Sequence, residues 1–135
     1  MEPIGLEIHH DAEIERAISA VAHEAGGGLI VMPDTFNMVH RRTSIGLAAR
    51  HRLPAIYPLP FFARDGGLIA YGPDEIDMFR RIAGYVDRIL KGAKPSDLAV
   101  QNPTRFKLAV NLRAAKAIGL TIPETFLLRA DEVIE

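Results

Sequence analysis

The sequence predicts an α/β fold, an open and mostly parallel sheet with helices on both faces in a three-layer αβα arrangement. Two observations predict it. Short β-branched runs alternate with amphipathic helical stretches, and the run 29–32 is apolar throughout, which is typical of a strand covered on both faces. Because 135 residues correspond to about one domain, residues 1–135 are expected to form a single α/β unit.

The expected elements follow from hydrophobic periodicity and from turn and cap residues. Strands are expected at 4–8, 29–32, 55–57, 68–71 and 106–110. Helices are expected at 11–25, capped by Asp11, and at 35–51, 73–90 and 112–118, with a last helical turn whose capping box is Thr121 and Glu124. The helix at 73–90 carries a stripe at helical spacing, Ile76, Phe79, Ala83, Val86 and Leu90, which the pattern alone predicts to be buried.

Composition excludes several functional classes. Sixteen Lys and Arg against seventeen Asp and Glu give a net charge of −1, so no nucleic-acid partner is expected. The absence of cysteine excludes disulfides and thiolate zinc sites, and neighbouring His9 and His10 would point to opposite faces of a strand, so no metal site is expected. No cofactor motif and no nucleophile–base pair is found, so no catalytic residue and no enzyme is predicted.

Polar and aromatic residues follow the expected strands. In sheets of this kind, ligands bind beyond the carboxyl ends of the strands. Asp34 follows the strand at 29–32, and Tyr57, Phe61 and Tyr71 lie near the ends of the next two strands, a set that suits a small organic solute with a charged group. Two structural alternatives stay open: Asp34 caps a helix, and Phe61 with Phe62 fills an edge of the core.

Four strings occur in a distinctive order: GGLIAYG, YVDRILKGAKPSDL, NLRAAKAIGL and RADEVIE. With them, almost the whole chain resembles the C-terminal part of the ABC transporter substrate-binding protein family that includes the tryptophan/tyrosine-type proteins. The resemblance implies the second lobe of a type I periplasmic-binding fold. Two such lobes close on a small organic solute such as an amino acid and deliver it to an ABC permease, without catalysis.

The resemblance also implies the site. The ligand-binding residues carried over are Asp34, Thr35, Phe36, Tyr57, Phe61, Gly67 and Tyr71. Asp34 would hold a ligand ammonium group and Thr35 would offer a hydroxyl or N–H, while Tyr57 and Phe61 would pack on the ligand body. This chain has Ala70 where the family usually has Ser, and the run 58–60 is less polar than usual, so the solute stays open.

Length and export are the main departures from the family. Family members are longer and periplasmic, whereas Met1-Glu2-Pro3 does not resemble the start of a signal peptide. The chain is therefore expected to be a fragment. Its helix at 74–90 is expected to belong to the first lobe of the complete protein. The bare stripe of that helix is expected to make the chain a homo-oligomer. The alternative is a stand-alone cytoplasmic ligand-sensing or protein-interaction domain that uses the same fold.

Overall fold

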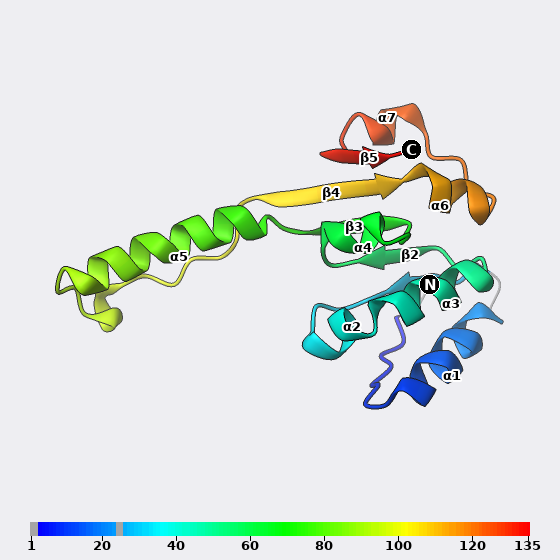
Figure 1. The fold of residues 1–135 in the computed structure, drawn as a ribbon, viewed down its shortest axis with the longest axis horizontal. Coiled ribbons are helices and arrows are strands. Elements are labelled where there is room, and N and C mark those ends of the chain that lie inside the picture. The colour runs from blue at the N-terminus through cyan, green and yellow to red at the C-terminus, as the bar shows by residue number, and fades with distance from the viewer. Residues whose placement is uncertain (1–2, 24–25) are drawn as a thin grey trace. The chain divides into compact units, whose positions relative to one another are not determined.

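The computed structural model describes residues 3–23 and 26–135. It contains two compact units, one formed by Met1–Gly72 with Lys107–Glu135 and the other by Pro73–Phe106. The first unit holds the sheet and both hydrophobic clusters, and the second holds one long helix and the segment that returns from it (Figure 1). The helix expected on the first-lobe side therefore lies in the second unit.

The sheet has five strands in the order of the chain, β1-β2-β3-β4-β5. Their bounds are β1 Leu29–Ile30, β2 Ala55–Tyr57, β3 Ile69–Pro73, β4 Phe106–Asn111 and β5 Glu132–Ile134. The pairs β1–β2, β2–β3 and β4–β5 are parallel. Parallel strands need crossover connections, and helices supply them here, so the mostly parallel α/β prediction is confirmed.

The helices of the first unit are α1 Asp11–Ala22, α2 Thr35–Val39, α3 Arg41–Arg50, α4 Pro60–Arg64, α6 Leu112–Ala117 and α7 Glu124–Leu127. The main cluster joins α3 and α4 to one face of the sheet through residues such as Ala48, Tyr57 and Phe62. A second cluster packs Ile14 and Ile18 of α1 near Leu47 and Leu53. Strand alternation places Ile56 on the other face, where it is exposed beside its register partner Ile30.

Several expectations about the elements differ from the structure. Residues 4–8 form no strand, and β1 lies at the edge of the sheet with β2 as its neighbour. The helix expected at 35–51 is two helices that meet at His40, whose ring lies 4.3 Å from that of Phe36. His10, not Asp11, is the N-cap of α1, and Pro123, not Thr121, is the N-cap of α7. The strand β5 had no counterpart among the expected elements.

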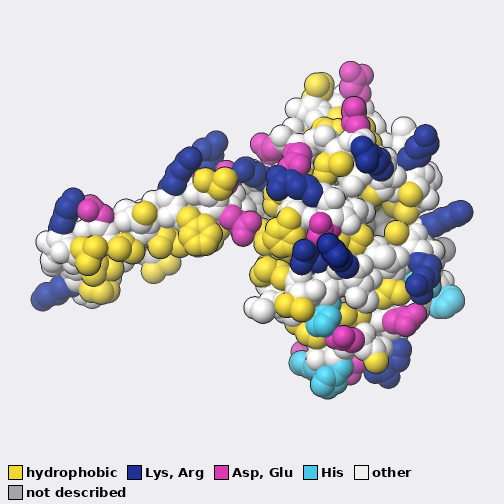
Figure 2. All heavy atoms as spheres, in the orientation of Figure 1, with side chains coloured by type: hydrophobic (Ala, Val, Ile, Leu, Met, Phe, Trp, Pro, Cys, Tyr) yellow, Lys and Arg dark blue, Asp and Glu magenta, His cyan; other side chains and the backbone are white. Residues whose placement is uncertain are grey.

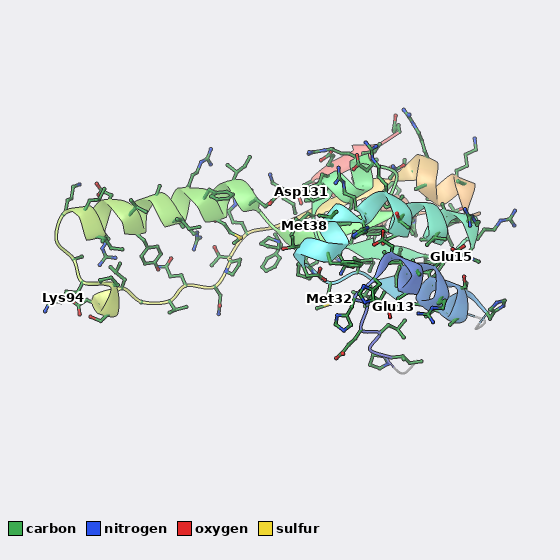
Figure 3. The ribbon with its side chains drawn as sticks, turned by 60° about the horizontal axis from the view of Figure 1, so that its bottom comes forward. Glu13, Glu15, Met32, Met38, Lys94 and Asp131 are labelled. Atoms are coloured by element: carbon green, nitrogen blue, oxygen red, sulfur yellow. The ribbon has the colours of Figure 1, made fainter. Side chains whose placement is uncertain are left out.

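The second unit consists of α5 (Glu75–Leu90) and a return segment with one 3-10 turn, Pro95–Asp97. Asp74 caps α5 because its Oδ1 accepts hydrogen bonds from the N–H groups of Ile76 and Asp77, and Pro73 ends β3 instead of opening the helix. Figure 3 shows the return segment alongside α5, with Lys94 at the turn between them. No helix in the described part of the chain is long and apolar enough to cross a membrane.

Candidate functional site

The carboxyl ends of β1, β2 and β3 meet at one edge of the sheet because these strands are parallel. The Val31 N–H donates to the Ile56 carbonyl oxygen at 2.9 Å and continues the pairing past the end of β1. A Cβ on Gly72 would lie 1.8 Å from the Pro58 carbonyl oxygen. Only glycine permits so close an approach, and the ends of β2 and β3 are therefore held tightly side by side.

Asp34 follows β1 and caps α2. Its carboxylate accepts hydrogen bonds from the Asn37 N–H at 2.9 Å and from Asn37 Nδ2 at 2.6 Å, and the same Nδ2 group donates to the Met32 carbonyl oxygen. The capping alternative is thus present in the structure, yet Asp34 and Thr35 are both exposed. Asn37 is not among the predicted site residues, although a cap residue followed three positions later by an amide side chain is a usable local signal.

The two predicted phenylalanines lie half-buried. Phe36 packs against the cluster of Ile14 and Ile18 and against the His40 ring. Phe61 stacks on Phe62 at a centroid distance of 4.9 Å, and the Arg41 guanidinium lies 5.4 Å from its ring centre. Phe61 therefore has a cation over its ring and a buried aromatic neighbour, which fixes its orientation.

Tyr57 and Gly67 belong to the core. The Tyr57 side chain is 1% exposed and stacks on Phe62 at 5.2 Å. Burial raises the pKa of its hydroxyl far above the usual value, so the group stays neutral. A Cβ on Gly67 would lie 2.7 Å from Cε2 of the Tyr57 ring, so the glycine backbone packs too closely against this ring to carry a side chain.

Tyr71 completes the set and differs from Tyr57, because it lies on the other face of the sheet and is 56% exposed. The seven predicted residues therefore separate into two groups. Asp34, Thr35 and Tyr71 are exposed at or near the ends of the strands, with Phe61 half-buried, whereas Phe36, Tyr57 and Gly67 pack against the core below.

A groove of about 390 Å³ lies elsewhere in the first unit, between α3 and α6. Tyr57 and Gly67 line it, but Asp34, Thr35, Phe36, Phe61 and Tyr71 do not. Leu53 and Gly66 on its wall precede β2 and β3, so the groove lies at the amino ends of these strands. The groove also reaches Asn111 and Ile134, the last residues of β4 and β5, so it lies at the carboxyl ends of those two strands.

Comparison with known proteins decides the family. A family model described as ABC transporter substrate binding protein matches residues 4–134. The chain belongs to the ABC transporter substrate binding protein family. The resemblance inferred from the four sequence strings is thereby confirmed, and a search of the curated proteins finds no match.

Three solved structures are similar to this family member. A conserved domain protein from Vibrio cholerae shares 27% identity at a TM-score of 0.80 over 90% of this chain and 41% of its own. An ABC domain from Streptococcus pneumoniae in complex with L-Trp shares 25% identity at a TM-score of 0.79. The match covers 91% of this chain and 42% of that one. A substrate binding protein with adhesive properties from Clostridium difficile, in a ligand-free, open structure, shares 19% identity at a TM-score of 0.65. The match covers 95% of this chain and 42% of that one.

These similarities confirm the expected fold, an α/β unit of the periplasmic-binding-protein kind. The chain spans about two fifths of the length of the solved structures that it matches. We call the edge of the sheet where β1, β2 and β3 have their carboxyl ends the strand-end edge. It belongs to a member of a substrate-binding family, and the solved structures that this member matches are much longer.

Proposed function

We propose that this chain is the solute-binding component of an ABC-type importer and recognises a small organic solute, such as an amino acid, in the periplasm. The match of residues 4–134 to the family model carries the proposal. The similar structure in complex with L-Trp supports an amino acid as the solute class. The proposed partner in the complete transporter is an ABC permease, and the proposed function includes no catalytic step.

The proposed contact surface is the exposed part of the strand-end edge. The exposed Asp34 carboxylate would attract a solute ammonium group because the two groups carry opposite charges. Thr35 would add a hydroxyl or N–H, and Phe61 and Tyr71 would offer ring faces to an apolar solute body. Phe36, Tyr57 and Gly67 would act from below, by fixing α2 and the end of β2.

This edge alone is expected to bind weakly. High-affinity sites for small molecules bury most of the ligand surface, and a single open edge leaves one side of the solute in water. The chain also spans about two fifths of its solved relatives, so the opposing wall of such a site is proposed to lie in residues that this chain does not contain. We therefore expect dissociation constants on the order of millimolar or weaker for the chain as given.

NMR titration of the 15N-labelled chain with L-Trp tests the proposal. We expect concentration-dependent shifts of the amides of Asp34, Thr35 and Tyr71, and no shift for residues that line the groove between α3 and α6. The variant Asp34→Asn keeps the oxygen that accepts the Asn37 N–H, and it removes the charge and the acceptor of Asn37 Nδ2. It should still cap α2 and lose the response to L-Trp.

Two results would contradict the proposal in different ways. Shifts confined to the groove residues, such as Ala114 and Ala117, would move the site away from the strand-end edge. Micromolar affinity measured by calorimetry would show that the chain encloses the solute without further residues. Benzoate serves as a control solute because it has a ring and a carboxylate but no ammonium group.

A further inference from the structure

The face of α5 that packs within its own unit is not its apolar face. Arg81 donates to the Thr104 hydroxyl, and the Tyr85 hydroxyl donates to the Ala99 carbonyl oxygen. Asp77, four residues before Arg81, forms an ion pair with it at 2.9 Å. These side chains repeat at a spacing of four residues and define one side of the helix, to which the return segment is attached.

A second side of α5 is apolar and exposed. We call it the α5 stripe; it consists of Ile76, Phe79, Ile82, Ala83, Val86, Ile89 and Leu90. The large side chains of the stripe are between 41% and 82% exposed, and α5 has no buried residue. Figure 2 shows hydrophobic side chains in a continuous row along this helix. A row of this length on one helix face is typical of a protein–protein contact.

The charges that flank the α5 stripe fit a second copy of the same helix. Arg80 and Asp87 lie seven residues apart on the same flank, on either side of Ala83. In two antiparallel helices related by a twofold axis, each flank meets the same flank of the partner. Asp87 also forms an ion pair with Lys91 of its own helix at 2.8 Å. With the axis near Ala83, Arg80 of one copy lies near Asp87 of the other and would share this carboxylate with Lys91, and two such contacts form.

The apolar residues match to within one residue of this register. Phe79 comes to lie opposite Val86 and Ile76 opposite Leu90 of the second copy, with the small Ala83 side chains at the centre, where the helices can approach closely. The antiparallel arrangement also places the amino-terminal end of each helix beside the carboxyl-terminal end of its partner, so the two helix dipoles are oppositely directed. A parallel pair would bring like helix ends together.

We propose that the α5 stripe is a dimerisation surface that binds the α5 stripe of a second copy in antiparallel orientation. The dimer adds an interaction surface to the chain and is independent of the proposed solute site, which lies in the other unit. Light scattering should therefore show a mass that rises with concentration from 14.8 kDa toward about twice this value.

Two matched substitutions test the surface. Phe79→Asp should return the mass to that of the monomer at all concentrations. Val100→Asp, at a side chain that is 97% exposed in the same unit but off the stripe, should leave the dimer intact. Arg80→Asp should weaken association about fivefold, and adding Asp87→Arg should restore it, because the charges of each pair are then exchanged.

Cysteine cross-linking tests the orientation, since the natural chain has no cysteine. Ala83→Cys alone should form a disulfide-linked dimer under mild oxidation. Ile76→Cys alone should not form one. Position 76 lies seven residues from Ala83, roughly 10 Å along the helix from the twofold axis, so the two copies of the cysteine would be about 20 Å apart. A mixture of Ile76→Cys and Leu90→Cys chains should cross-link.

The outcomes that would overturn the proposal are distinct. A constant mass near 14.8 kDa up to high concentration would exclude the second copy and would indicate that a different polypeptide covers the α5 stripe. Cross-linking of Ile76→Cys alone would exclude the antiparallel orientation. Loss of the dimer in Val100→Asp but not in Phe79→Asp would place the contact on another surface. Circular dichroism of each variant shows whether α5 is still folded.

Discussion

Gly67 is the predicted site residue whose position leaves the least room for a side chain. Its backbone packs closely against the Tyr57 ring, and a Cβ there would also lie 2.8 Å from the Phe62 carbonyl oxygen. The family resemblance placed Gly67 among the ligand-facing residues. Its packing gives it another role, because any side chain would push Tyr57 and the end of β2 out of position.

We expect Gly67→Ala to lower the free energy of unfolding by about 1–3 kcal/mol, because the methyl group would overlap both the Tyr57 ring and the Phe62 backbone. Urea denaturation measures the change. Gly46→Ala is the matched control, since Gly46 lies in α3 with no atom within 4 Å of its Cβ position. That variant should be neutral or more stable by up to about 1 kcal/mol, and equal loss in both would contradict the steric argument.

At the scale of elements, the sequence predicted helices and strands best where interactions between neighbouring residues determine the structure. The helix expected at 112–118 is present as α6, and the Asn111 Oδ1 caps it by accepting the Ala114 N–H at 2.9 Å. Strand 55–57 was also correct, because an apolar run bounded by Pro54 and Pro58 is a strong local signal. Elements of this kind need no information about distant residues.

The expectations that failed depend on neighbours far along the chain. Residues 4–8 alternate apolar and other residues as a strand does, but a strand also needs a pairing partner, which sequence periodicity cannot supply. The strand β5 is short and was missed because long-range contacts hold it: β4 on one edge and Arg64 of α4, which pairs with Glu132. Periodicity reports the apolar face of α5 and not what covers it, so the exposure of the α5 stripe was expected from the family resemblance and not from the pattern alone.

The ion pair between Arg64 and Glu132 connects α4 to β5, and its contribution to stability should depend on pH. Two hydrogen bonds of 2.8 and 2.7 Å link the guanidinium to the carboxylate, and they lower the pKa of Glu132 below its ordinary value of 4.5. A lowered pKa means that the pair stabilises the fold above about pH 4.5. The contribution is lost as the pH falls through the lowered value.

We expect Glu132→Gln to lower the free energy of unfolding at pH 7 by about 0.5 kcal/mol, a small value because both side chains are partly exposed and screened by water. The difference from the unmodified chain should disappear near pH 3, which denaturation series at several pH values can measure. Glu15→Gln is the control, because its pair with Arg50 is longer, at 3.5 Å, and more exposed. A difference that persists unchanged in acid would exclude the ion pair as its cause.

At the scale of the whole molecule, the two units differ in what holds them together. The first unit encloses fully buried side chains such as Tyr57, Phe62 and Val110, whereas no residue of α5 is buried. Because buried apolar area is the main source of stability, α5 should open locally at a lower free energy than the sheet. Its stability should then depend on whatever covers the α5 stripe.

Native-state hydrogen exchange at different protein concentrations should reveal this dependence. If α5 pairs with a second copy, a hundredfold increase in concentration should slow the exchange of its interior amides on the order of tenfold by mass action. The Asn111 amide, which donates to the Leu68 carbonyl oxygen inside the sheet, should not respond. Phe79→Asp should abolish the concentration dependence of α5 alone. Exchange of α5 that is slow and constant at every concentration would show instead that contacts within one chain hold the helix, since only an intermolecular contact responds to dilution.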